Sequence, residues 1–285
     1  MAHDYDATGW REGASAWVEN EALFDSVYTP VTAEIVERAG FRSNERALDV
    51  GCGSGTLLAA GTAAGSTMVG VDIAPDMVEA ARRRVPEATV LLGDAQTMDI
   101  GAHAPGAPFE RVVSRFGVMF FSDPTAAFAN VRSVTAPGAH LVFVCWRSIA
   151  ENPSFGGAGT EAITAALPDP PAPPPPGTPG PMAFADRDYL ATILTDAGWD
   201  KVAVDPFDTV FDHSVDGSDG VEERLTLILA TTTGRLAREQ LDNTITTEKW
   251  SDVVERTREQ IQTYVVDGSV KLPGALWLVT ASNQH

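Results

Sequence analysis

The stretch Ala47-Leu-Asp-Val-Gly-Cys-Gly-Ser-Gly-Thr-Leu-Leu58 is an apolar run that breaks into a glycine-rich turn and resumes with helical spacing. Gly51, Gly53 and Gly55 carry no Cβ, so a ligand can lie against the backbone amides of the turn. The free N–H groups at the start of the following helix would face the same ligand. The sequence therefore predicts a strand, a cradle for a nucleotide-like ligand and a helix.

Two later apolar runs end in an acidic residue. Val69-Gly-Val-Asp72 lies about twenty residues beyond the glycine turn, the distance at which doubly wound folds place a carboxylate on ribose hydroxyls. Thr89-Val-Leu-Leu-Gly-Asp94 repeats the pattern one strand later. Any one of these acids is more often a helix cap or a turn residue. Their order along the chain, each at a strand end, favours a ligand site.

This arrangement resembles the class I S-adenosylmethionine-dependent methyltransferases. Their first motif, Asp-x-Gly-x-Gly-x-Gly, is matched by Asp49, Gly51, Gly53 and Gly55. The resemblance covers residues 40 to 150 well and implies an α/β fold. We expect a doubly wound, Rossmann-like sheet of about seven strands, mostly parallel with an antiparallel last strand, and a helical cap or insertion.

The resemblance also implies the cofactor and its contacts. The cofactor would be S-adenosyl-L-methionine and the product S-adenosyl-L-homocysteine. In this family the acid at Asp72 bonds the ribose hydroxyls, Asp94 and Ala95 face the adenine, and Asp49 lies near the methionine part. The complete predicted cofactor set is Asp49, Gly51, Cys52, Gly53, Gly55, Asp72, Ile73, Met77, Asp94, Ala95, Arg115 and Phe116.

Other functions remain open at this point. A nicotinamide-dependent oxidoreductase would carry G-x-G-x-x-G, but here the third glycine comes one residue early and Thr56 follows it. An enzyme of the same fold could use the cofactor site for non-methyl chemistry such as a cyclisation. A non-catalytic cofactor-binding protein is the third alternative.

Length and composition narrow the function further. With 285 residues, 44% of them hydrophobic, the chain fits one domain with an insertion. A formal net charge of -19 argues against nucleic-acid substrates and anionic membranes. Two cysteines allow no disulfide framework, no metal site is predicted, and no signal peptide is visible. We expect a cytoplasmic enzyme, monomeric or homodimeric, acting on a small molecule.

The chain divides into segments of a single domain, 1–285. A sixth strand is predicted at Trp199–Phe207 and the last at Leu272–Ala281. The prolines after the fifth strand supply no amide donors, so this segment is neither helix nor central strand. Its place after the fifth strand favours a lid or pocket wall, and the alternative is a passive surface insertion. The predicted segments are an N-terminal helical cap (1–40), a cofactor-binding core (41–150), a Pro-rich lid (151–185) and a C-terminal half (186–285) with a helical insertion at about 209–271.

Methyl transfer needs positioning of two reactants, and in some cases a base. His213 follows the predicted sixth strand and is the candidate catalytic residue. The acceptor is expected to be apolar or aromatic, methylated on oxygen or nitrogen rather than carbon. Its predicted pocket is made of Trp10, Trp17, Tyr28, Met119, Trp146, Phe155 and Phe184.

Overall fold

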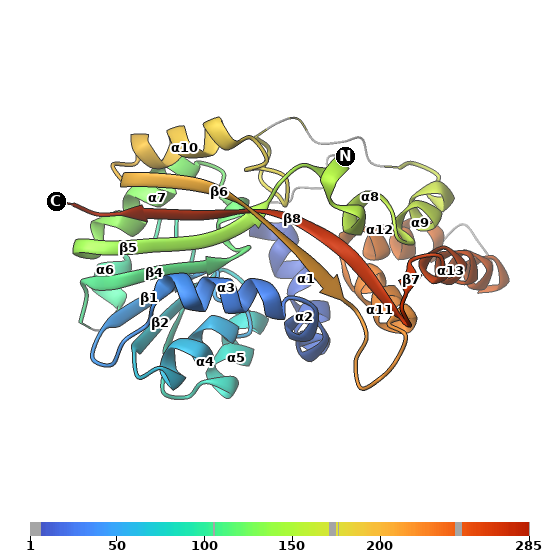
Figure 1. Cartoon of the computed structure of the whole chain (residues 1–285), viewed down its shortest axis with the longest axis horizontal. Helices are drawn as coiled ribbons and strands as arrows, with labels where there is room; N and C mark the ends of the chain where they lie inside the picture. The colour runs from blue at the N-terminus through green and yellow to red at the C-terminus, as the bar shows by residue number, and fades with distance from the viewer. Residues whose placement is uncertain (1–6, 105, 171–174, 176, 243–246, 285) are drawn as a thin grey trace.

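The computed structural model describes residues 7–104, 106–170, 175, 177–242 and 247–284. Its strands lie in the order β3-β2-β1-β4-β5-β8-β6, with β7 paired to β8 (Figure 1). Their bounds are β1 Arg46–Val50, β2 Thr67–Asp72, β3 Thr89–Leu92, β4 Phe109–Arg115, β5 Thr135–Trp146, β6 Asp200–Asp212, β7 Val265–Val266 and β8 Ser269–Ser282.

The sheet is mostly parallel. The first five strands pair in parallel, and β8 runs antiparallel between β5 and β6. In β1, Ala47 and Leu48 are completely buried, as a central strand covered on both faces requires. The predicted doubly wound sheet with an antiparallel last strand is therefore confirmed. The short β7, which extends the sheet beside β8, was not predicted.

Helices alternate with the strands and cover the sheet. α3 packs on β4 and β5, while α10 packs on β6 and on α7. The bounds are α1 Ala7–Glu19, α2 Glu21–Val27, α3 Thr29–Ala39, α4 Thr56–Ala63, α5 Pro75–Arg84, α6 Ile100–His103, α7 Pro124–Ser133, α8 Pro153–Gly156, α9 Thr160–Ala166, α10 Arg187–Asp196, α11 Val221–Ala230, α12 Thr232–Asp242 and α13 Thr247–Gln262, with single 3-10 turns at Val118–Phe120 and Ile149–Glu151.

A helical body lies at one end of the sheet, on the right in Figure 1, and consists of α8, α9, α11, α12, α13 and β7. It has its own apolar cluster, which includes Ile163, Leu225, Ile228 and Ile261 and is separate from the main core. Segments far apart in sequence therefore share one small core, because α9 packs on α12 and α13.

Two predicted boundaries differ from the structure. β6 continues to Asp212, five residues beyond the predicted end at Phe207, because it stays paired with β8 as far as Asp212 and Lys271. The insertion therefore begins after Asp212 rather than at about 209, and its first helix, α11, starts at Val221. The segment predicted as a Pro-rich lid begins with α8 and α9, and the prolines at 171, 173, 174 and 176 lie outside the described residues.

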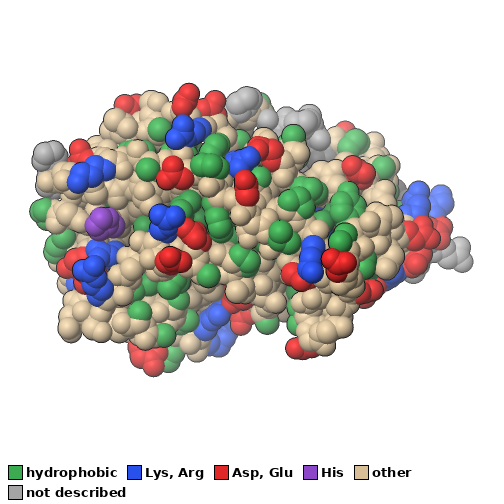
Figure 2. Space-filling model, viewed as in Figure 1, with side chains coloured by type: hydrophobic (Ala, Val, Ile, Leu, Met, Phe, Trp, Pro, Cys, Tyr) green, Lys and Arg blue, Asp and Glu red, His purple; other side chains and the backbone are tan. Residues whose placement is uncertain are grey.

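Charged side chains are interspersed on the surface. In Figure 2, described Lys and Arg side chains stand singly or in small groups among Asp, Glu and apolar side chains. A continuous basic stripe, which a phosphate backbone would need, is not seen among the described side chains of that face. Within the described ranges, no helix is long and apolar enough to span a membrane.

Candidate active site

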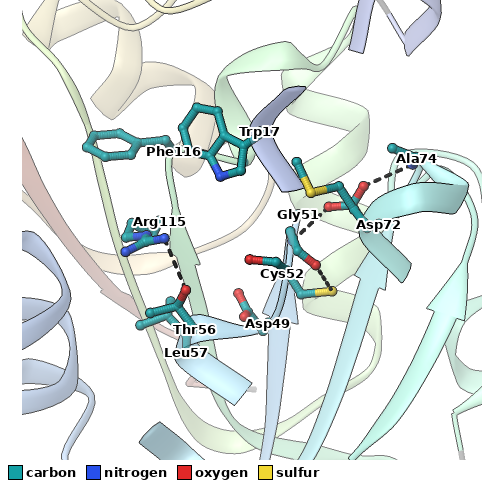
Figure 3. A pocket seen from close by; sticks show the side chains of 14 residues that line it. Trp17, Asp49, Gly51, Cys52, Thr56, Leu57, Asp72, Ala74, Arg115 and Phe116 are labelled. Carbon is teal, nitrogen blue, oxygen red and sulfur yellow. Dashed lines mark hydrogen bonds between the residues drawn. The ribbon is translucent and has the colours of Figure 1, made fainter. Parts of the chain in front are cut away.

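A pocket lies where β1, β2 and β4 end and α4 begins. Parallel pairing brings these strand ends together, since Asp49 of β1 is in register with Gly70 of β2 and Val113 of β4. The cavity measures about 50 Å³. Its lining residues, shown in Figure 3, are Trp17, Asp49, Gly51, Cys52, Gly53, Ser54, Thr56, Leu57, Asp72, Ala74, Met77, Arg115, Phe116 and Gly117.

The glycine turn is held tightly against the neighbouring strand ends. The backbone amides of Gly51 and Cys52 both donate to the carbonyl of Val71, at 2.9 and 3.1 Å. Gly51 has φ +66°, and a Cβ there would lie 2.7 Å from the Cα of Gly117. Only glycine fits without displacing backbone, which explains the glycine at this position in physical terms.

Asp72 fastens the same turn from the second strand. One carboxylate oxygen accepts from the amide of Gly53 at 2.9 Å and the other from the amide of Ala74 at 2.9 Å. Burial raises the pKa of this carboxyl, while these amide hydrogen bonds oppose the rise. Each carboxylate oxygen has a second lone pair. Asp72 can therefore hold the turn and still accept from a ligand.

Asp49 lies deeper, at the floor of the pocket in Figure 3. Its carboxyl is 1% exposed, and Oδ1 has no hydrogen-bond partner among the described residues. Burial raises its pKa to about 8, with Arg115 opposing and Asp72 adding to the rise. A buried acid without a partner is costly, so a cationic or hydrogen-bond-donating ligand in the pocket would relieve it.

Arg115 ends β4 and ties the N-terminal helices to the pocket. Its guanidinium donates to Asp25 of α2 at 2.9 Å, to Thr32 of α3 at 2.9 Å and to Thr56 of α4 at 3.1 Å. Asp25 also pairs with Arg84 at 2.7 Å. Asp25 and Thr56 were missed in the sequence, because residues 90 and 59 positions away from Arg115 give no local signal of this contact.

The comparisons with known proteins identify this architecture. A model described as "Methyltransferase domain" matches residues 47–138. Demethylmenaquinone methyltransferase of Renibacterium salmoninarum is 29% identical over 59% of this chain and 72% of that protein. Aklanonic acid methyltransferase DauC of a Streptomyces species is 29% identical over 48% of this chain and 66% of that protein.

The chain has a class I S-adenosylmethionine-dependent methyltransferase domain. A Haemonchus contortus phosphoethanolamine N-methyltransferase solved with S-adenosylhomocysteine has a TM-score of 0.55, at 17% identity over 98% of this chain and 58% of that one. The [4+2]-cyclase SpnF has a TM-score of 0.51, at 15% identity over 99% and 97%. These two likenesses show the fold, whereas the domain match and the sequence relatives identify the methyltransferase and its cofactor, S-adenosylmethionine.

Not every residue in the predicted cofactor set of the methyltransferase lines the pocket. Asp94 and Ala95 follow β3, one strand further along the sheet, and Asp94 accepts from the amide of Gln96 at 2.8 Å. Gly55 caps α4 and faces Ala81 instead of the cavity. Ile73 stands between two lining residues without lining the cavity itself. The cavity therefore lies at the ends of β1, β2 and β4 but does not extend to the end of β3.

An aromatic cluster lies beside the pocket. Phe116, a lining residue, stacks on Trp146 with ring centroids 4.8 Å apart and meets Tyr28 edge to face at 5.2 Å. Phe155 contacts the edge of Trp146 at 4.9 Å, and Phe211 contacts both Trp146 and Tyr28. Three residues predicted for the substrate pocket thus gather here, with Phe211 missed, since the sixth strand was predicted to end before it.

The remaining predicted substrate residues lie elsewhere. Trp17 lines the glycine-turn pocket and stacks on Phe24 of α2 with ring centroids 3.6 Å apart. Met119 and Phe184 are buried in the main core and do not line the cavity, because Phe184 packs on Phe128. Trp10 is in α1, but its side chain lies outside the described residues.

His213 does not line the pocket. Its ring is buried against β8, with Nδ1 3.3 Å from the carbonyl oxygen of Val270. Burial, with Arg224 adding to the effect, lowers its pKa to about 4. A neutral, enclosed imidazole of such low basicity is a poor general base. The structure therefore gives no support for the predicted catalytic role of His213.

Proposed function

We propose that the enzyme transfers the methyl group of S-adenosylmethionine to the oxygen or nitrogen of a small, apolar or aromatic acceptor. The observation that carries the proposal is the double position of Phe116, whose ring belongs both to the pocket wall and to the aromatic cluster. An acceptor among these rings would lie next to the cofactor. Ligand sites are commonly lined by apolar and aromatic side chains with few polar groups.

Different residues of the predicted cofactor set would bind different parts of S-adenosylmethionine. We assign Asp72 to the ribose hydroxyls and Asp49 to the positively charged methionine end, where its unpartnered Oδ1 would gain a donor. Asp94 and Ala95 would face the adenine at the end of β3. The glycine turn supplies a surface without Cβ atoms. The hydrogen-bonding groups at the ends of β1, β2 and β3 thus match the donors and acceptors of the cofactor in kind.

The N-terminal helix α1 contributes one residue to the pocket lining, Trp17. Figure 3 shows its ring beside the other lining side chains, and this ring stacks on Phe24 of α2. We infer that Trp17 covers the cofactor when it is bound.

The bound cofactor supplies an electrophilic methyl group. The residues of this chain have to orient the acceptor and exclude water from it. No histidine is among the pocket-lining residues that the structure describes. This favours acceptors that attack as a neutral amine or as an already deprotonated oxygen, because these need no strong base. A cytoplasmic setting, supported by two buried free thiols, remains a prediction, as does a monomeric or homodimeric state.

The test is a methyl-transfer assay with isotopically labelled S-adenosylmethionine and a panel of phenols, aromatic acids, amines and apolar carbon acids. We expect label in an oxygen or nitrogen product, with one S-adenosylhomocysteine formed per product. Label on carbon would contradict the favoured atom. Cofactor binding without S-adenosylhomocysteine formation by any acceptor would instead favour non-methyl chemistry or a non-catalytic role. Saturable NADH binding would favour an oxidoreductase.

A further inference from the structure

Arg224 is a buried cation without a counter-ion among the described residues. It lies in the first turn of α11 and is 5% exposed. Nε donates to the carbonyl of Ala158 at 3.2 Å, and Nη2 donates to the carbonyl of Ser154 at 2.7 Å and to Oγ1 of Thr160 at 3.3 Å. Within the described part of the chain, no carboxylate pairs with it and Nη1 has no hydrogen-bond partner.

This arrangement is unusual for an arginine. Carbonyl oxygens satisfy donors but do not neutralise the charge, and buried charges in proteins are normally paired. Burial lowers the pKa of the guanidinium to about 10, so the group stays protonated near neutral pH. A partly exposed arginine of the same helical body, Arg258, does have carboxylate partners, because it pairs with Glu222 and Glu255.

Arg224 is also next to the aromatic cluster. Its acceptor Ser154 directly precedes Phe155, whose ring meets the edge of Trp146 at 4.9 Å. Trp146 stacks on Phe116, which lines the cofactor pocket. The charge of Arg224 also acts on Tyr28, where together with Arg115 it opposes the rise in phenol pKa that burial causes. A continuous series of contacts therefore joins the cofactor pocket, the rings and the cation.

We propose that Arg224 binds an acidic group of the methyl acceptor, so that the substrate is an aromatic carboxylate and not a neutral aromatic compound. This rests on the proposed function, because it assigns a chemical class to the same acceptor. A guanidinium presents parallel N–H donors that match a carboxylate, and the unpartnered Nη1 would gain an acceptor. One relative is named for an acid, aklanonic acid.

The negative net charge of the protein gives a second argument for a role of Arg224 in carboxylate binding. A protein with a net charge of -19 repels anions in solution, so affinity for a carboxylate requires a local cation. Arg224 supplies this cation where water is excluded and electrostatic attraction is strong. The surrounding rings would hold the apolar part of the same molecule.

The test compares matched pairs of aromatic carboxylates and their primary amides, such as 2-naphthoate with 2-naphthamide and salicylate with salicylamide. Each is titrated by calorimetry into protein saturated with S-adenosylhomocysteine. We expect carboxylates to bind about tenfold or more tightly than their amides, Arg224→Gln to abolish this preference, and Arg224→Lys to keep part of it. The control Arg258→Gln removes an arginine of the same helical body and should retain the preference.

Several outcomes would overturn the proposal. These are equal binding of acids and amides to the wild type, no binding of either, or a preference that survives in Arg224→Gln. The wild-type comparison needs no variant, so it decides even if Arg224→Gln unfolds. The affinity for S-adenosylhomocysteine is measured in every protein. If the wild type does not bind S-adenosylhomocysteine, the proposed function itself is contradicted. If it binds S-adenosylhomocysteine but binds acids and amides equally, only the proposal for Arg224 is contradicted.

Discussion

The glycine-turn pocket and the helical body are built in opposite ways. In the pocket, Gly51 and Cys52 directly follow β1 and Asp72 ends the neighbouring parallel strand β2, so backbone hydrogen bonds set much of the geometry. In the helical body, Arg224 meets acceptors 66 and 70 residues earlier in the chain, and one apolar cluster joins α9 to α13. The contacts of the glycine turn are thus encoded by nearby strand ends, whereas the contacts of Arg224 depend on distant segments of the chain.

The first prediction concerns Gly51→Ala, which should disrupt the glycine-turn pocket. Gly51→Ala places a Cβ 2.7 Å from the Cα of Gly117 in a left-handed conformation. We expect the free energy of unfolding to fall by about 3 kcal/mol and cofactor binding to be lost. Urea unfolding and calorimetry measure the two effects.

The matched control is Gly138→Ala. Gly138 has φ +83°, but a Cβ added there would meet nothing within 4 Å, so only the conformational cost remains, about 1 kcal/mol. Equal losses in both variants would show that the approach to Gly117 has no importance for the pocket.

The second prediction breaks the helical body while sparing the pocket. Ile261 is completely buried in the apolar cluster of that body. Ile261→Ala should cost about 3 kcal/mol of unfolding free energy and speed hydrogen exchange in α9 and α11, while S-adenosylhomocysteine binding is kept. Ile149, 54% exposed, gives the control Ile149→Ala, which should change little. If binding fell along with stability, the two regions would not be independent.

The third prediction concerns Asp72. Asp72→Ala removes the acceptor of the Gly53 and Ala74 amides and the carboxylate that we assign to the ribose. We expect S-adenosylmethionine affinity to fall by about 1.5 to 3 kcal/mol, measured by calorimetry. Asp76→Ala, an exposed acid in the first turn of α5, is the control and should bind normally. Unchanged affinity in Asp72→Ala would remove the assigned ribose contact.

The last prediction is a pH dependence at Asp49, whose pKa rises from 3.8 to about 8 in the folded chain. Between these values the folded protein keeps a proton that the unfolded chain has lost, so stability falls as pH rises through this window. Asp49→Asn should lack this part of the fall in a series of urea unfolding curves.

The same carboxyl should titrate when the cofactor binds. A cationic methionine end favours the charged form of Asp49, so binding at about pH 6 should release a proton. Calorimetry in buffers of different ionisation enthalpy counts released protons. Release that persists in Asp49→Asn would show that the proton comes from another group.

The contrast between the regions also explains what could be predicted from sequence. The parallel strands and the glycine turn follow from local runs such as 47–58 and 69–72, because each strand and the turn after it lie within a few residues. The antiparallel last strand was expected only from the resemblance to class I methyltransferases. The Asp25 partner of Arg115 and the setting of Arg224 depend on segments folded together from a distance. His213 was misjudged for the same reason: position after a strand does not reveal whether a ring faces a cavity or, as here, the β8 backbone.

The central claim is that the glycine-turn pocket binds S-adenosylmethionine and that the adjoining rings receive the acceptor. Calorimetric titration of the wild-type protein with S-adenosylmethionine, S-adenosylhomocysteine and NADH, followed by the same titrations of Gly51→Ala and Ile261→Ala, tests it most directly. We predict saturable binding of the first two ligands only, lost in Gly51→Ala and kept in Ile261→Ala. Binding of NADH, or adenosyl-ligand binding that survives in Gly51→Ala, would contradict it.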